Sequence, residues 1–227
     1  MERRLKINLC SGPSMWPGTD WVHIDHVDQR EYIRILREDV SAEMAATWPD
    51  DQRRLSDYLR GGDKLDFRQH DVREPLAMFA DGSIDAIYLG QCVEHFNRQH
   101  GLIDLLAECH TLLKPGGVLR ITTPDLDILL DAYRLGRMHQ FADEQPAYYA
   151  KAAPPDQLAY IMFGATGPDC QMESYEGHFH CFTRGTIATA LTEAGFSGPY
   201  RFEGKSDAFA EAIDKGMTHS LGVEAVK

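Results

Sequence analysis

The stretch Leu112-Leu113-Lys114-Pro115-Gly116-Gly117-Val118-Leu119-Arg120-Ile121 decides the fold, because it marks a sharp passage from helix to strand. A proline cannot continue a helix, and a glycine accepts the positive φ angles that a tight turn needs. The pattern predicts a helix over 101–113, a turn, and a strand over 118–122. Upstream, residues 84–89 have the apolar run of another buried strand, and Val93-Glu94-His95-Phe96 follow it.

The rest of the chain alternates short apolar segments with amphipathic ones. We expect further strands over 5–9, 21–24, 65–69, 200–203 and 220–226. We expect helices over 126–136 and 183–194, two more between 30 and 60, and a weak one over 207–215. Strands that alternate with helices indicate a mostly parallel sheet that is covered on both faces. Residues 137–182 show no clear periodicity and are expected to form a lid or insertion in a single domain spanning 1–227.

Composition excludes several classes of partner. The chain has 227 residues and a net charge of −12, which argues against nucleic-acid binding, because that binding needs lysine and arginine to displace counterions. No apolar run approaches the ~18 residues of a membrane span, and the first residues read as a strand rather than a signal peptide. The five cysteines are odd in number and lack C-x-x-C spacing, so we expect reduced thiols and a cytoplasmic location.

Polar or small residues follow each of the first four predicted strands. Ligands of such sheets bind beyond the carboxyl ends of the strands, where the strand order reverses. An aspartate after the second strand can accept hydrogen bonds from both hydroxyls of a ribose, and one after the third can accept a bond from an adenine amino group. Either aspartate alone is better explained as a turn or cap residue, but their occurrence at successive strand ends favours a nucleoside site. The residues are Cys10-Ser11-Gly12, Asp25, Asp71-Val72 and Gly90-Gln91.

The first turn does not suit a dinucleotide. A pyrophosphate site uses a G-x-G-x-x-G turn that opens a full helix, whose N-terminal amides bind the phosphates. Here only Gly12 is in that register, and residues 14–20 are too few for a full helix and contain Pro17 and Gly18. The sequence therefore disfavours NAD, FAD and a nicotinamide-dependent oxidoreductase.

These segments, together with the Lys114-Pro115-Gly116-Gly117 turn and Glu94-His95, resemble class I S-adenosylmethionine-dependent methyltransferases, in particular a small bacterial-type group similar to methyltransferase type 11. The resemblance covers roughly residues 5–135 and resumes near 178–196 and 223–227. It implies an α/β, Rossmann-like doubly wound sheet of seven strands, mostly parallel with the last strand antiparallel, and helices on both faces. It also implies S-adenosyl-L-methionine as the cofactor.

The resemblance assigns nine residues to the cofactor. Leu9, Cys10 and Gly12, with the intervening Ser11, would contact the methionine part, and Gly90 and Gln91 would lie behind it. Asp25 would bind the ribose, and Asp71 and Val72 the adenine. The family usually has Leu-Gly-Cys-Gly at the first turn, so Cys10 replaces a glycine. A Cβ there costs little at negative φ and could collide with the cofactor at positive φ.

The acceptor side of such an enzyme needs a group that aligns or deprotonates the acceptor. The candidates are Glu94 and His95, after the fourth strand, and His178 and His180, which would share one face of a strand. Glu94 could equally cap a helix near Asn97, and we expect Asp125 to be an N-cap. A metal would need a third ligand beside the two later histidines, from Glu94, His95 or Cys170. None has diagnostic spacing, so we expect no metal and disfavour a metal-dependent hydrolase.

The sequence therefore predicts methyl transfer from S-adenosylmethionine to a small-molecule or sugar-like acceptor, with residues 137–182 on the acceptor side. The alternative is a binding protein or pseudoenzyme that keeps the fold but is altered at Cys10-Ser11. No nucleic acid or membrane partner is expected, and the oligomeric state is not readable.

Overall fold

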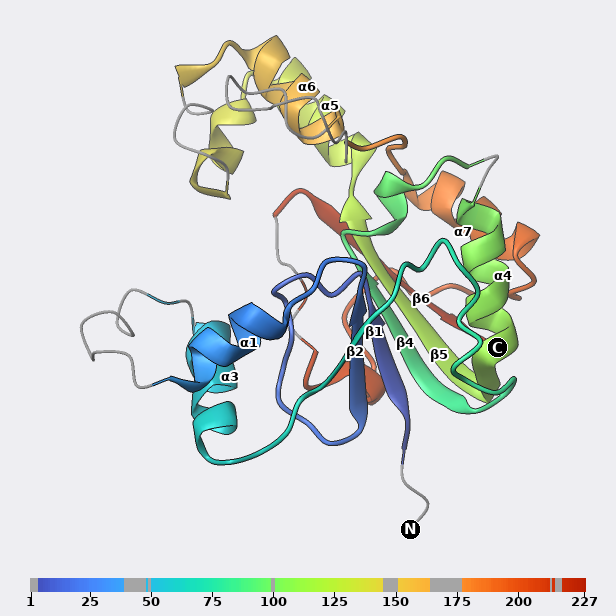
Figure 1. Ribbon diagram of the computed structural model, residues 1–227. Helices are drawn as coiled ribbons and strands as arrows, with labels where there is room; N and C mark the ends of the chain where they lie inside the picture. Colours follow the sequence, from blue (N-terminus) through green and yellow to red (C-terminus); the bar gives the residue numbers. More distant parts are fainter. Residues whose placement is uncertain are drawn as a thin grey trace.

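The computed structural model describes residues 4–38, 48, 50–98, 101–144, 151–163, 177–212, 214 and 218–227. Its centre is a six-stranded sheet in the order β3-β2-β1-β4-β5-β6 (Figure 1). The first five strands are parallel, and β6 runs antiparallel to β5. This is the predicted mixed, doubly wound sheet. Its strands are β1 (Lys6–Leu9), β2 (Trp21–Asp25), β3 (Asp66–Gln69), β4 (Ile84–Gly90), β5 (Leu113–Pro124) and β6 (Ser220–Val226).

The predicted strand over 200–203 does not form among the described residues, so the sheet has six strands rather than seven. Arg201 makes one isolated bridge to Glu224 of β6, through a pair of backbone hydrogen bonds of 2.9 and 2.8 Å. The pairing cannot extend far, because Pro199 has no N–H to donate and Gly204 turns the chain at a φ of 71°.

The Pro-Gly-Gly segment lies inside β5, which begins earlier than predicted. Ile84 pairs with Leu113, and the register then shifts before Ala86 pairs with Val118. Gly117 is required here, because a Cβ at this position would lie 2.9 Å from the carbonyl oxygen of Lys114. The Lys114 ammonium forms an ion pair of 2.9 Å with Asp85 on the neighbouring strand, which holds the irregular start of β5 against β4.

Five helices lie where they were predicted, with small boundary shifts: α1 (Arg30–Arg37), α3 (Asp50–Arg60), α4 (Leu102–Leu112), α5 (Leu126–Arg134) and α7 (Arg184–Glu193). A further helix, α6 (Pro154–Phe163), lies in the region for which no element was assigned from the sequence. Three short 3₁₀ segments add to them: η1 (Val93–His95), η2 (Met138–Glu144) and η4 (Asp207–Phe209). The last of these is all that the described residues show of the predicted helix over 207–215. None of the described helices is long and apolar enough to cross a lipid bilayer.

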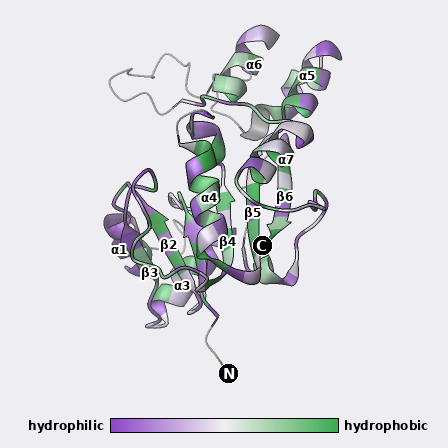
Figure 2. Ribbon diagram, turned by 90° about the vertical axis from the view of Figure 1, so that its right-hand side faces the viewer, coloured by the Kyte–Doolittle hydropathy of each residue, from purple (hydrophilic) through white to green (hydrophobic). Residues whose placement is uncertain are grey.

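One face of the sheet carries the main core. Leu106 of α4 and Ile187 of α7 are fully buried against strand residues such as Ile87 and Ile121. Figure 2 shows α4 crossing in front of the strands, with hydrophobic residues in green. The opposite face is covered by a smaller aromatic cluster in which Trp16 packs edge-on against Trp21 and Tyr88, with Phe209 of η4 beside them.

A separate layer stands beyond the carboxyl ends of the strands. We refer to α5, η2 and α6 together as the cap; Figure 1 shows its helices projecting away from the sheet. The cap has its own small apolar cluster, which consists of Leu129, Ala132, Met138, Phe141 and Ile161. It overlaps the predicted insertion over 137–182, of which residues 145–150 and 164–176 lie outside the described part of the chain.

Candidate active site

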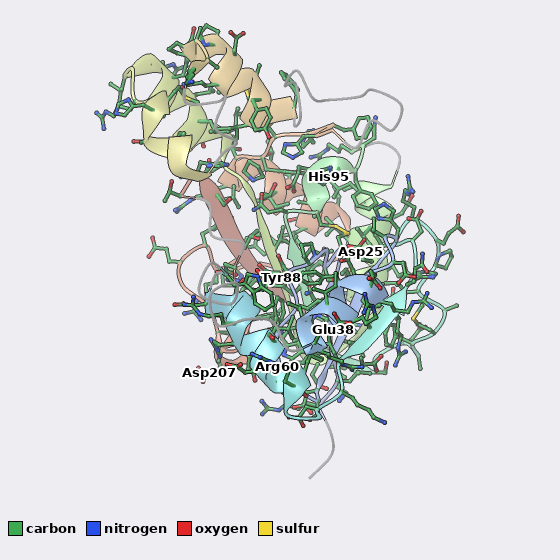
Figure 3. All side chains as sticks on the ribbon, turned by 60° about the vertical axis from the view of Figure 1, so that its left-hand side comes forward. Asp25, Glu38, Arg60, Tyr88, His95 and Asp207 are labelled. Atoms are coloured by element: carbon green, nitrogen blue, oxygen red, sulfur yellow. A yellow bond between two sulfur atoms is a disulfide. The ribbon has the colours of Figure 1, made fainter. Side chains whose placement is uncertain are left out.

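The order of the strands reverses between β1 and β4, and a cavity of about 370 Å³ opens at their carboxyl ends. This is where ligands of open α/β sheets bind. Figure 3 shows Asp25 and His95 toward this same end of the sheet. Seven of the thirteen residues predicted for the site line the cavity: Cys10, Gly12, Asp25, Asp71, Val72, Gln91 and His95.

Asp25 is the more buried of the two acidic residues that line the cavity. Its Oδ2 accepts a hydrogen bond of 2.7 Å from the backbone N–H of Gly12, and its Oδ1 accepts one of 2.8 Å from the N–H of Val27. The side chain is only 8% exposed. Each carboxylate oxygen can accept more than one hydrogen bond, so the two amides orient Asp25 and still leave it acceptor capacity for a ligand.

Asp71, which also lines the cavity, is held by Arg73. The guanidinium donates from Nη2 to Oδ2 at 2.5 Å and from Nε to Oδ1 at 2.9 Å. This hydrogen bonding is the main reason that the pKa of Asp71 falls to about 2, so the carboxylate is ionised at neutral pH. Val72 lies beside it and is nearly buried.

Cys10 forms a disulfide with Cys92, so the expectation of reduced thiols is wrong for this pair. The two residues are 82 positions apart, but they follow the neighbouring strands β1 and β4, and their Cα atoms are 5.9 Å apart. Cys10 also has a φ of 53°, the positive value at which a Cβ was expected to crowd the cofactor. Its side chain is instead bonded to the next loop. Cys109 and Cys181 are free thiols, and Cys170 lies outside the described residues.

Three other predicted cofactor residues do not line the cavity. Leu9 and Ser11 are fully buried, and Gly90 is buried at the end of β4. A Cβ on Gly90 would lie 2.5 Å from the ring of Tyr88, so this glycine is needed for aromatic packing on the sheet. These positions shape the backbone around the cavity.

On the other side of the cavity, η1 presents Glu94 and His95. Glu94 is fully buried, and its Oε2 accepts a hydrogen bond of 3.1 Å from the hydroxyl of Thr123. It does not cap a helix, because α4 begins at Leu102 with Gly101 as its N-cap. Asp125 does act as an N-cap, as predicted, and accepts from the N–H of Asp127.

His178 is brought to η1 from a distant part of the chain. Its ring lies edge-on to that of His95, with centroids 4.9 Å apart. Its Nδ1 donates to the carbonyl of Ile161 at 3.0 Å. Burial, followed by the neighbouring His95, lowers the pKa of His178 to about 4, so the ring is neutral at physiological pH.

Ligand atoms of Glu94, His95 and His178 lie within 4.8 Å of one another, so the three side chains form one cluster. His180 is not in this group. Its ring packs edge-on against Phe182 at 4.6 Å, and residues 177–181 form no strand, so the expected shared strand face with His178 does not arise.

Two residues near this group were missed from the sequence. Thr123 lies at the carboxyl end of β5, so the rule that polar residues at strand ends carry function would have found it. His219 is buried at the start of β6, and its charge contributes to the lowered pKa of His178. No signal in the sequence indicates that proximity, because it depends on the antiparallel pairing of β6.

Comparisons with known proteins agree with this geometry. A family profile described as a methyltransferase domain matches residues 20–121. The structure of a SAM-dependent methyltransferase from Archaeoglobus fulgidus superimposes on all of this chain and 87% of its own, with a TM-score of 0.51 and 13% identity. An O-methyltransferase family protein from Burkholderia thailandensis gives a TM-score of 0.50 and 15% identity over 100% of this chain, which spans 51% of that protein.

No curated protein matches the sequence. At such identities the structural matches establish the fold. Residues 20–121 therefore match the methyltransferase domain family, and the chain has the fold of the class I S-adenosylmethionine-dependent methyltransferases.

Proposed function

We propose that this chain transfers a methyl group from S-adenosylmethionine to a small-molecule acceptor, and that the cofactor lies across the carboxyl ends of β1, β2 and β4. The observation that carries the proposal is Asp25, an acidic side chain at the end of β2 whose carboxylate is oriented by two backbone amides beside the cavity. A carboxylate in this position of the fold suits the two hydroxyls of a ribose.

The shape of the first loop supports a nucleoside without a diphosphate. Residues 10–20, all of which are described, contain no helix. The loop therefore lacks the row of helix N-terminal amides that binds a pyrophosphate. The volume of about 370 Å³ is within the range of small-molecule sites, and the residues present fit S-adenosylmethionine better than NAD or FAD.

S-adenosylmethionine, when bound, supplies a methyl group activated by its positively charged sulfur. The chain's own residues then have three tasks. Asp25 holds the sugar, and Asp71 and Val72 bind the edge and face of the base. Cys10, Gly12 and Gln91 surround the remaining part of the ligand.

The acceptor side is formed by η1 and residues 177–180. Since methyl transfer from a sulfonium is an in-line displacement, the residues here mainly align the acceptor and exclude water. His95, which is exposed at the cavity, is the candidate to take a proton from an acceptor hydroxyl or amine. A pKa of about 4 keeps the His178 ring neutral and makes it a weak base, so its role is to position the acceptor or His95. Sugar-like acceptors fit the polar character of this group.

Calorimetric titration of the purified chain with S-adenosylmethionine, S-adenosylhomocysteine and NAD tests the proposal. We expect one equivalent of each of the first two to bind and NAD to give no heat. Formation of S-adenosylhomocysteine with a panel of hydroxylated small molecules then tests turnover. Absence of binding to both sulfur nucleosides would reject the proposal, and binding without turnover over the whole panel would favour the pseudoenzyme alternative.

A further inference from the structure

We propose that Glu94, His95 and His178 form a site for one divalent transition-metal ion of the zinc type, beside the cofactor cavity. Their ligand atoms already lie within 4.8 Å of one another. Ligands of a tetrahedral zinc ion with bonds of 2.0–2.1 Å are separated by about 3.3 Å. The difference is within reach of side-chain rotation, because His95 is exposed at the cavity.

The backbone holds the two halves of this site together. The carbonyl oxygen of Glu94 accepts hydrogen bonds from the N–H groups of Phe179 and His180, at 2.8 and 3.2 Å. The N–H of His178 donates to the carbonyl of Phe163 at 3.0 Å. The segment that carries His178 is therefore fixed against η1 on one side and α6 on the other, without any contribution from the three ligand side chains.

Two of the three ligands also have the outer partners that metal ligands usually have. Nδ1 of His178 donates to the carbonyl of Ile161, which fixes the ring and makes Nε2 the nitrogen that faces a ligand. The Thr123 hydroxyl donates to Oε2 of Glu94 and orients the carboxylate. Both bonds would persist with an ion bound.

The donor set selects the kind of ion. Two imidazoles and one carboxylate suit zinc, cobalt, nickel, manganese or ferrous iron, whereas magnesium and calcium prefer oxygen ligands only. Three protein ligands are also the pattern of zinc sites that keep an open coordination position for water or substrate. The site thus differs from a closed structural metal site.

The location of Glu94, His95 and His178 in the fold indicates which ligand would occupy the free coordination site of the ion. His95 lines the cofactor cavity together with Gln91 and Gly177, the residue before His178. An ion bound here would lie on the acceptor side of the cavity. This part of the inference rests on the proposed function: it narrows the acceptor to a small molecule that offers an oxygen donor to the ion, such as a diol or a hydroxy acid.

Metal binding to the full, tag-free chain tests the site directly. After treatment with a chelator and dialysis, the protein is titrated with Co²⁺ and followed by its visible d–d absorption, and then with Zn²⁺ in competition. We expect one equivalent of Co²⁺ with an intense, tetrahedral-type spectrum and no sulfur-to-cobalt charge-transfer band. Absence of binding, or a thiolate band that shows capture by a cysteine, would overturn the proposal.

The variants His95→Ala, His178→Ala and Glu94→Gln should each weaken Co²⁺ binding at least 10-fold. His180→Ala is the matched control, since it lies in the same segment but outside the group, and it should bind as the wild type does. His95→Ala is the most informative variant because an exposed side chain can be removed without disturbing folding; its far-ultraviolet spectrum should be unchanged. Equal losses in His95→Ala and His180→Ala would refute the assignment.

The metal and cofactor titrations separate the two proposals. Metal-free protein that binds S-adenosylhomocysteine but not Co²⁺ would overturn the metal site and leave the proposed function intact. Protein that binds Co²⁺ through these residues but neither sulfur nucleoside would support the site and remove the proposed function.

Discussion

The sheet has a large hydrophobic core and the cap a small one. The two halves of the candidate site, the cofactor side and the acceptor side, differ in which of these cores supports them. The main core extends over β1, β2, β4, β5, β6, α4 and α7, whereas the described residues of the cap include five buried apolar ones. The cofactor half of the site stands on the sheet. The acceptor half depends on the cap, because His178 is held through carbonyls of Ile161 and Phe163 in α6. On the proposed function, the cofactor would bind at the larger sheet core and the acceptor chemistry would take place beside the smaller cap.

Substitutions at a matched pair of leucines test whether the cap and the sheet differ in stability. Leu106 in α4 and Leu129 in α5 are both fully buried helical leucines, one in the main core and one in the cap. Leu106→Ala should lower the free energy of global unfolding by about 2–5 kcal/mol. Leu129→Ala should lower it less and instead speed amide hydrogen exchange in α5 and α6. Urea denaturation and hydrogen exchange measure both. Equal shifts of the global transition would show that cap and sheet unfold as one unit.

The sheet should also show a characteristic loss of stability in acid. His23 on β2 is buried, and this burial lowers its pKa to about 4. Its Nδ1 accepts from Asn8 and its Nε2 donates to the carbonyl of Trp16, a pattern that only a neutral ring can satisfy. The unfolded chain binds a proton near pH 6.5 and the folded chain does not. Stability therefore falls as the pH drops from about 6.5 to about 4, by about 3 kcal/mol from this group.

The variant His23→Gln tests whether His23 causes this loss of stability in acid. Its unfolding free energy should depend less steeply on pH between 6.5 and 4 than that of the wild type, whatever its value at neutral pH. His178, with a pKa also near 4, adds a contribution of the same sign in both proteins. Parallel pH profiles for the variant and the wild type would contradict the assignment to His23.

Within the cofactor half, Asp25→Ala should weaken S-adenosylhomocysteine binding by about 1–3 kcal/mol, or roughly 5- to 150-fold, because hydrogen bonds to a charged group are lost. Asp28→Ala is the control: it removes a neighbouring carboxylate that bonds to Arg30 at the surface and does not line the cavity. Calorimetry of both variants gives the comparison. If Asp25→Ala and Asp28→Ala bound S-adenosylhomocysteine with similar affinity, Asp25 would not be a ribose ligand.

The smallest effect is expected at the exposed edge of the cavity. Arg73→Ala should raise the pKa of Asp71 from about 2 toward its ordinary value, since the Arg73 guanidinium is the main cause of the depression. Global stability should change by less than about 1 kcal/mol, because the pair is exposed to solvent. Carboxyl-carbon NMR titration measures the pKa, with Arg68→Ala, which removes the partner of Asp66, as the control. If the pKa of Asp71 stayed near 2 in Arg73→Ala, a group other than Arg73 would be the main cause of its depression.

The strands of the sheet could be predicted from the sequence more accurately than the helices of the cap, for a physical reason. Each buried parallel strand is an apolar run bounded by turn residues, so β1, β2, β3, β4 and β6 were placed within a residue or so. The strand ends followed from the same pattern, and with them Asp25, Asp71 and Gln91. The missing strand at 200–203 shows the limit: a short apolar segment was read as a strand, although Pro199 and Gly204 restrict its pairing.

The features that escaped prediction all depend on long-range contacts. The Cys10–Cys92 disulfide joins residues after two strands that are neighbours in space but 82 positions apart. The approach of His178 to Glu94 and His95 depends on backbone hydrogen bonds across a similar separation. Spacing in the sequence cannot reveal such groups. The sequence named Glu94, His95 and His178 as candidates, but their spacing could not indicate that the fold brings their ligand atoms within 4.8 Å of one another.

A crystal structure with S-adenosylhomocysteine tests the central claim most directly. We predict electron density in the cavity at the ends of β1, β2 and β4, with both ribose hydroxyls within hydrogen-bond distance of Asp25 and the sulfur turned toward His95. Density for the nucleoside elsewhere, or a ribose that leaves Asp25 bonded only to the amides of Gly12 and Val27, would contradict the account.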